Sequence, residues 1–125
     1  MIEWKITMET KIHKKSGILE VGADKIILHS AQDALDLMVL AGDKGCRKII
    51  LYKKTINPQF FELKSGLAGE VLQKFANYRL KLAVVGDFSA ISSKSLKSFI
   101  YESNRSGQFF FVQTLKDALA KLNND

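Results

Sequence analysis

Three short apolar runs constrain the fold of this chain more than any other feature. They are Ile49–Tyr52, Leu82–Val85 and Phe109–Val112, and each has the length and composition of a strand that is buried on both faces. A segment with apolar residues at helical spacing follows each run. Because strands that alternate with amphipathic helices are joined by right-handed crossovers, the sequence predicts an α/β fold with parallel later strands.

Apolar spacing and capping signals together predict four helices. Ser30–Asp33 and Thr114–Asp117 each have the form of a capping box, a hydroxyl followed three residues later by an acid. The first helix would end near Ala41 and be closed by Gly42. The positions expected to face the core are Leu37, Met38 and Ala41; Ala68, Val71, Leu72 and Phe75; Leu96, Phe99 and Ile100; and Leu115, Ala118, Leu119 and Leu122.

The N-terminal part of the chain predicts additional strands. Trp4, Ile6 and Met8 alternate with polar residues, and Ile18–Val21 and Ile26–Leu28 follow the turn-prone stretches Lys-Lys-Ser-Gly and Gly-Ala-Asp. We expect these strands to pair in an antiparallel manner. The sheet would then be mixed, with five or six strands.

Composition sets bounds on organisation and compartment. A chain of 125 residues that is 46% hydrophobic can form one core but not two, so we expect a single domain over residues 1–125. The single cysteine, Cys46, leaves no intrachain disulfide, and the N-terminus lacks the apolar run of a signal peptide. No apolar run approaches the roughly 18 residues that a membrane-spanning helix requires. These features predict a soluble cytoplasmic protein that makes no membrane contact.

The net charge of +6 raises the question of an acidic partner or nucleic acid. The basic clusters lack interleaved exposed aromatic residues and any recognisable reading motif, so we favour a solvated lysine surface. Nucleic-acid binding is a weaker alternative, which predicts an affinity that declines steeply with salt. The clustered residues are Lys11, Lys14 and Lys15, and Lys44, Arg47, Lys48, Lys53 and Lys54.

Two long motifs carry a family resemblance. The first, FFELKSGLAGEVLQKFANYRLKLAVVGDF, runs from Phe60 to Phe88, and the second, SKSLKSFIYESN, from Ser93 to Asn104. Together they resemble an uncharacterised bacterial family catalogued as domain of unknown function 4180, over roughly the whole chain. The order of elements, with Ser65-Gly66-Leu67 opening the second helix, also resembles the STAS fold of bacterial anti-sigma-factor antagonists. That resemblance implies a STAS-like mixed sheet.

In STAS proteins of the sporulation type, phosphorylation of a serine at this helix start acts as a switch. The family's Asp-Ser-Ser matches Leu63, Lys64 and Ser65 here, so the aspartate and the phosphate-accepting serine are both replaced. This departure argues against a phospho-switch. Ser65 could still accept a phosphate beside free backbone N–H groups, but we favour a helix N-cap for it.

The second predicted helix carries a polar stripe at i, i+3, i+4 and i+7. The i,i+4 pair Glu70–Lys74 in this stripe is worth only a few tenths of a kcal/mol, so a solvated helix face would explain the pair. Its amide side chains, however, supply directional hydrogen bonds that suit a docking face. Gly66 and Gly69 form a weak Gly-x-x-Gly pattern, which we attribute to close packing on the sheet rather than to anion binding. The predicted partner-binding residues are Ser65, Gly66, Glu70, Gln73, Lys74 and Asn77.

Ligands of parallel sheets usually meet the loops at the carboxyl ends of the strands. Those loops are Lys53–Pro58, Gly86–Ser93 and Gln113–Thr114. Asn57 and Pro58 could begin a helical turn that turns either Phe60 or Phe61 toward a pocket below the loops. The predicted ligand-loop residues are Lys64, Asp87 and Ser93, and capping of the next loop is the commoner role for such an aspartate.

No motif for catalysis, metal binding or cofactor binding is present. The chain lacks a phosphate loop, a dinucleotide fingerprint and a Gly-x-Ser-x-Gly elbow, and His13, His29 and Cys46 have no ligand spacing. We therefore expect a non-catalytic interaction or regulatory module without metal or cofactor, which binds another protein or a second copy of itself through the Ser65–Asn77 helix and the Asp87 loop. The alternative is a small-ligand binder or unrecognised enzyme that uses Lys64, Asp87 and the serines between Ser89 and Ser95.

Overall fold

The computed structural model describes residues 8–123, which form a five-stranded sheet in the order β1-β2-β3-β4-β5. Strand β1 (Met8–His13) pairs antiparallel with β2 (Ile18–Ala23). Strands β3 (Lys48–Tyr52), β4 (Lys81–Val85) and β5 (Phe109–Val112) continue in parallel from β2. The predicted mixed α/β sheet is confirmed, with five strands.

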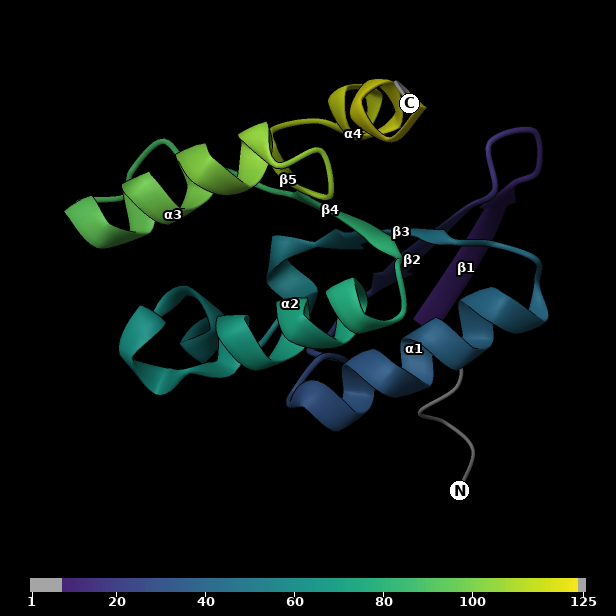
Figure 1. The fold of residues 1–125 in the computed structure, drawn as a ribbon, viewed down its shortest axis with the longest axis horizontal. Helices are drawn as coiled ribbons and strands as arrows, with labels where there is room; N and C mark the ends of the chain where they lie inside the picture. Colours follow the sequence, from purple (N-terminus) through teal and green to yellow (C-terminus); the bar gives the residue numbers. More distant parts are fainter. Residues whose placement is uncertain (1–7, 124–125) are drawn as a thin grey trace.

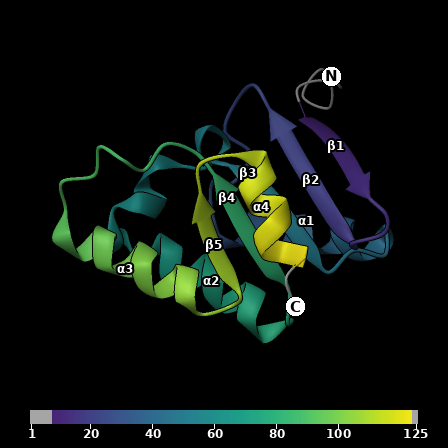
Figure 2. The same cartoon turned by 90° about the horizontal axis from the view of Figure 1, so that it is seen from above.

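Residues 8–123 also form four α-helices around this sheet, as predicted. Helices α1 (Ala31–Asp43) and α2 (Leu67–Asn77) cover one face, and α4 (Leu115–Asn123) lies on the other face over β4 and β5 (Figure 1). Helix α3 (Lys94–Arg105) runs alongside β5 at the edge of the sheet (Figure 2). Within residues 8–123, no helix has both the length and the apolar character needed to cross a bilayer.

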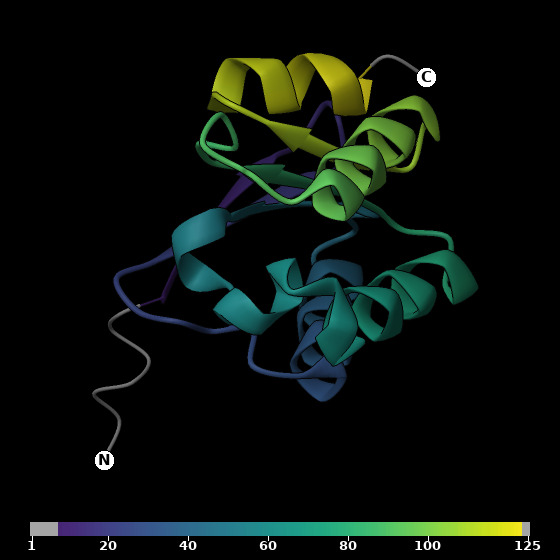
Figure 3. The same ribbon diagram turned by 90° about the vertical axis from the view of Figure 1, so that its left-hand side faces the viewer.

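The alternation of side chains along each strand divides the core into two layers. Figure 3 shows the helices that lie on either side of the sheet. In β3, Ile49 and Leu51 face α1 and α2, whereas Ile50 faces α4. The larger layer includes Phe60, Val71 and Phe75, all fully buried. The smaller layer contains Ile18, Ile50, Ala83, Val85, Phe110, Ala118 and Leu122.

The N-terminal hairpin is present, but its boundaries differ from the prediction. The strand predicted from Trp4, Ile6 and Met8 lies at Met8–His13, and Trp4 and Ile6 fall outside the described residues. The backbone N–H groups of Ser16 and Gly17 both donate to the carbonyl of His13, which closes the predicted turn.

The strand predicted at Ile26–Leu28 is wrong. Leu28 forms only an isolated parallel bridge with Ile56. The N–H groups of Ile27 and Leu28 both donate to the carbonyl of Thr55, at 2.8 and 3.1 Å. The backbone N–H groups of Ile27 and Leu28 therefore bond to a loop and not to a neighbouring strand.

The helix ends also depart from the predicted capping. The Ser30 side chain makes no capping hydrogen bond, and the Asp33 carboxylate instead accepts from the backbone N–H of His29 at 2.7 Å. Helix α1 continues to Asp43, two residues beyond the predicted end near Ala41, so Gly42 lies inside the helix and does not close it. At α4 the prediction holds in part, because the Thr114 hydroxyl accepts from the N–H of Asp117 at 3.1 Å.

The two edges of the sheet are built differently. At the β5 edge, the Asn104 side chain of α3 accepts from the Phe111 N–H at 2.7 Å and donates to the Phe111 carbonyl at 3.2 Å. At the β1 edge, no helix or strand of residues 8–123 lies outside the strand. A polar chain ties β1 inward instead: His13 Nε2 lies 2.9 Å from Glu20 Oε1, and the Tyr52 hydroxyl donates to Glu20 Oε2 at 2.7 Å.

Candidate functional site

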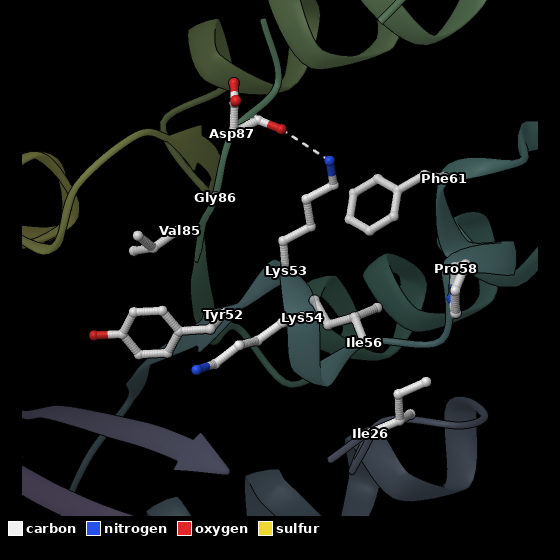
Figure 4. A pocket seen from close by; sticks show the side chains of 10 residues that line it. All are labelled: Ile26, Tyr52, Lys53, Lys54, Ile56, Pro58, Phe61, Val85, Gly86 and Asp87. Atoms are coloured by element: carbon white, nitrogen blue, oxygen red, sulfur yellow. Dashed lines mark hydrogen bonds between the residues drawn. The ribbon is translucent and has the colours of Figure 1, made fainter. Parts of the chain in front are cut away.

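An open pocket of about 630 Å³ lies at the carboxyl ends of β3 and β4, where the parallel topology predicted a ligand site. Two of the three predicted loops contribute to it, through Lys53–Pro58 and the start of Gly86–Ser93. Figure 4 shows the side chains around it. The lining residues are Ile26, Tyr52, Lys53, Lys54, Ile56, Pro58, Phe61, Val85, Gly86 and Asp87.

Lys53 is the most constrained polar group of this pocket. It begins the short 3-10 helix η2 (Lys53–Thr55), and its Nζ donates to the backbone carbonyl of Asp87 at 2.8 Å. The same ammonium lies 5.8 Å from the ring centre of Phe61 and 5.2 Å from that of Phe88. A Cβ at Gly86 would stand 2.5 Å from the Lys53 Cβ, so glycine is needed there for this close approach.

The aromatic wall of the pocket is held by its neighbours. As predicted, Asn57 caps a helical turn, the 3-10 helix η3 (Pro58–Phe61), by accepting from the Gln59 N–H at 3.0 Å. Phe60 is fully buried, whereas Phe61 lines the pocket. The Phe61 ring packs against the rings of Phe60, Phe88 and Phe111 at centre distances of 4.9, 5.9 and 6.4 Å. The sequence left the choice between the two phenylalanines open.

Asp87 contributes its backbone carbonyl to the pocket and directs its carboxylate elsewhere. Its carboxylate accepts from the hydroxyl and the backbone N–H of Ser89, at 2.6 and 2.9 Å. In Figure 4 this carboxylate points away from the pocket, while the carbonyl meets Lys53. The Ser89 hydroxyl and N–H, followed by the Lys53 charge, lower the pKa of the Asp87 carboxyl below its usual value. The aspartate thus caps the following loop.

The other predicted ligand residues lie apart from this pocket. Lys64 is exposed on the 3-10 helix η4 (Leu63–Ser65). The Ser93 hydroxyl caps α3 by accepting from the Leu96 N–H at 3.2 Å. Of the predicted trio, the structure places Asp87 in the lining.

Several lining residues were not predicted. Lys54 lies within the predicted loop Lys53–Pro58 but was not named as a ligand residue, and Ile26 was assigned to a strand. Because the topology brings Ile26 to the pocket from another part of the chain, no local sequence signal could have placed it there.

The start of α2 differs from the predicted cap. The N-cap is Gly66, in the left-handed conformation at φ 80°, and Ser65 ends η4. The Ser65 hydroxyl accepts from the Leu67 N–H at 3.2 Å and donates to the Gln59 carbonyl at 2.6 Å. Ser65 therefore ties the helix start to η3, one residue before the cap position.

The polar stripe of α2 lies on the protein surface. Glu70, Gln73 and Asn77 are exposed and Lys74 is half-buried. Gln73 Nε2 donates to Asn77 Oδ1 at 2.9 Å, which orients both amides. A depression of about 370 Å³ beside the stripe is lined by Ala31 of α1 and by Glu70, Gln73 and Lys74.

The packing explanation for the two glycines of α2 is wrong. Apart from its chain neighbours and its own helix backbone, a Cβ at Gly66 or at Gly69 would meet no atom within 4 Å. The left-handed backbone accounts for Gly66. Gly69 is exposed, and no close approach within the described residues explains it.

The histidines and the cysteine lie in separate places. Cys46 is buried in the larger core layer. His13 contacts Glu20, and His29 contacts Asp33 at 3.1 Å. In the part of the chain that the structure describes, no three His, Cys, Asp or Glu side chains gather in a group that could hold a metal ion.

These features define an α/β protein with a pocket at its strand ends and an exposed polar helix beside it. The chain belongs to the family described as Domain of unknown function (DUF4180), which matches residues 13–122. Comparison with curated proteins and with solved structures found no match. Since the family description assigns no activity, the function has to be argued from the surfaces themselves.

Proposed function

We propose that the protein is a non-catalytic interaction module of STAS-like fold, which binds a protein partner through the exposed face of α2. This binding face consists of Gly66, Gly69, Glu70, Gln73 and Asn77, with Lys74 at its border. Ser65 supports the face by fixing the helix start to η3.

Gly69 is the observation that carries this proposal. Glycine in a helix interior costs about 1 kcal/mol relative to alanine, and Gly69, the third residue of α2, bears at most this cost. Gly69 is exposed, and its surroundings would accept a Cβ without any contact under 4 Å. Glycine at this position would allow the backbone of a partner to pack directly against this turn of α2, where a side chain would keep it away. Gln73, one turn further along, would supply a directional hydrogen bond at the same face.

Two variants of the binding face test the proposal by affinity capture from cells that make the protein. Gly69→Gln should stabilise the isolated chain by roughly 0.5–1 kcal/mol through helix propensity, yet should block capture of the partner. Gln73→Ala/Asn77→Ala should weaken capture with little effect on stability. Sedimentation of the purified chain covers the case in which the partner is a second copy.

A double variant on α3, Lys97→Ala/Glu102→Ala, serves as the matched control, because both residues are exposed and the change leaves net charge unaltered. This control should capture the partner as the wild type does. Capture of the same proteins by the Gly69→Gln variant would exclude the proposed face.

A further inference from the structure

We propose that the pocket at the ends of β3 and β4 binds a small organic carboxylate with an apolar, ring-containing body. This site is separate from the α2 binding face, so either proposal can fail without the other. The volume of about 630 Å³ lies within the range of small-molecule sites, roughly 300–1,000 Å³.

The walls of the pocket require a ligand with an apolar body. Ile26, Ile56, Pro58, Phe61 and Val85 line it with aliphatic and aromatic surface. The Phe61 ring is fixed by the surrounding phenylalanines, so it offers a preformed face for stacking. A free inorganic anion would leave this apolar surface uncovered.

The charge of the pocket requires an anion. Two ammonium groups, those of Lys53 and Lys54, line it. The lining holds one carboxylate, that of Asp87, which interacts with the Lys53 charge and points away from the pocket. Two ammonium groups against one carboxylate leave the lining with a net positive charge.

The two lysines have different roles in this proposal. Lys53 uses one N–H on the Asp87 carbonyl, which holds its ammonium in place and leaves two N–H donors for a ligand. The Lys54 ammonium makes no hydrogen bond or ion pair with any residue from 8 to 123. Figure 4 shows its side chain leaving η2 in a different direction from Lys53, toward Tyr52. Lys54 is thus an unengaged cation on the pocket wall.

The test measures binding of naphthoate and of its neutral analogue naphthylmethanol to the purified protein by amide NMR. The Gly86 N–H, which donates to the Val112 carbonyl at 2.9 Å, reports occupancy. Naphthoate should shift the Gly86 signal saturably, with a Kd of about 1 mM or tighter. Naphthylmethanol should bind more weakly.

Lys54→Met is the decisive variant, because it keeps an apolar stem and removes an exposed ammonium that has no partner among residues 8–123. It should weaken naphthoate binding about three- to tenfold and change naphthylmethanol binding by less than about twofold. Lys64→Met, on the exposed η4, should leave both affinities unchanged. Ile26→Trp should fill the pocket and abolish both.

Three results would overturn the proposal. They are the absence of any saturable Gly86 shift with naphthoate up to about 10 mM, equal affinity of the wild type for naphthoate and naphthylmethanol, and a Gly86 shift with inorganic phosphate but none with naphthoate.

Discussion

The two edges of the sheet meet the same requirement by different means. An edge strand presents backbone N–H and C=O groups that need partners. At β5, the Asn104 amide supplies one donor and one acceptor to Phe111, as a neighbouring strand would. At β1, the three consecutive residues Glu9, Thr10 and Lys11 are all exposed to solvent.

The comparison teaches that a neutral amide bonds to the β5 edge, whereas the side chains that connect β1 to the sheet include titratable groups. The amide of Asn104 carries no charge and does not change with pH. Strand β1 is joined to the sheet by its ladder to β2 and by a polar chain through His13, Glu20 and Tyr52, and burial and Glu20 raise the pKa of Tyr52. An exposed lysine such as Lys11 also discourages pairing with another strand. The β1 edge should therefore be the pH-sensitive one.

The largest expected effect comes from removing the amide at the β5 edge. Asn104→Ala should lower the free energy of unfolding by about 2 to 3 kcal/mol, because two hydrogen bonds are lost and two partly buried backbone groups are left unsatisfied. Urea denaturation measures the loss. Hydrogen exchange at the Phe111 amide should accelerate in the same variant.

Asn77→Ala is the control for this prediction. Asn77 is an exposed asparagine that bonds to Gln73 within the same helix, so its loss should stay within about 0.5 kcal/mol. Equal losses in the two variants would mean that the Asn104 contact does not hold the β5 edge.

A smaller effect on stability is expected at Tyr52, the last residue of β3, which connects through Glu20 to His13 of β1. Burial, followed by the hydrogen bond to Glu20 and its negative charge, raises the pKa of Tyr52 from 10.0 to about 12. The unfolded chain then releases this proton at lower pH than the folded chain does, so stability should fall as pH rises from 10 to about 12.

Tyr52→Phe should cost about 1 kcal/mol at neutral pH, where the hydrogen bond is lost. Above pH 10 the difference in unfolding free energy between wild type and variant should narrow, because the wild type loses stability as Tyr52 titrates and the variant has no such group. Thermal unfolding across that range measures the gap. Tyr78→Phe, at an exposed tyrosine, should follow the wild type throughout. A gap that stays constant up to pH 12 would show that Tyr52 does not titrate as expected.

The sequence was informative about the fold because buried parallel strands are nearly continuous apolar runs. Ile49–Tyr52, Leu82–Val85 and Phe109–Val112 each became a strand within one residue of the prediction. Ile26–Leu28 has the same composition, but the backbone groups of Ile27 and Leu28 form hydrogen bonds with Thr55 and Asn57 in a distant loop. A short apolar run does not reveal whether its partner is a strand or a loop.

The site was predictable as a location and not as a set of side chains. Parallel topology placed it at the ends of β3 and β4, where the pocket lies. Ser93 and Asp87 both carry groups suited to a ligand, yet each satisfies a nearby backbone N–H instead. Such local capping competes with ligand binding for the same serine and aspartate side chains, and coordinates are needed to see which use prevails.

The smallest effect is expected at His13, and it sharpens the comparison on the β1 side. The His13–Glu20 contact is 2.9 Å long with 19% and 15% of the two side chains exposed, whereas the His29–Asp33 contact is 3.1 Å long with 66% and 31% exposed. Because a less exposed polar contact is screened less by solvent, His13→Ala should cost about 0.5–1 kcal/mol and His29→Ala less than about 0.5 kcal/mol. Urea denaturation of both variants at neutral pH gives the difference. A His13→Ala variant as stable as the His29→Ala variant would mean that β1 is held by its backbone ladder to β2 alone, and that the polar chain to Tyr52 does not reach the edge strand.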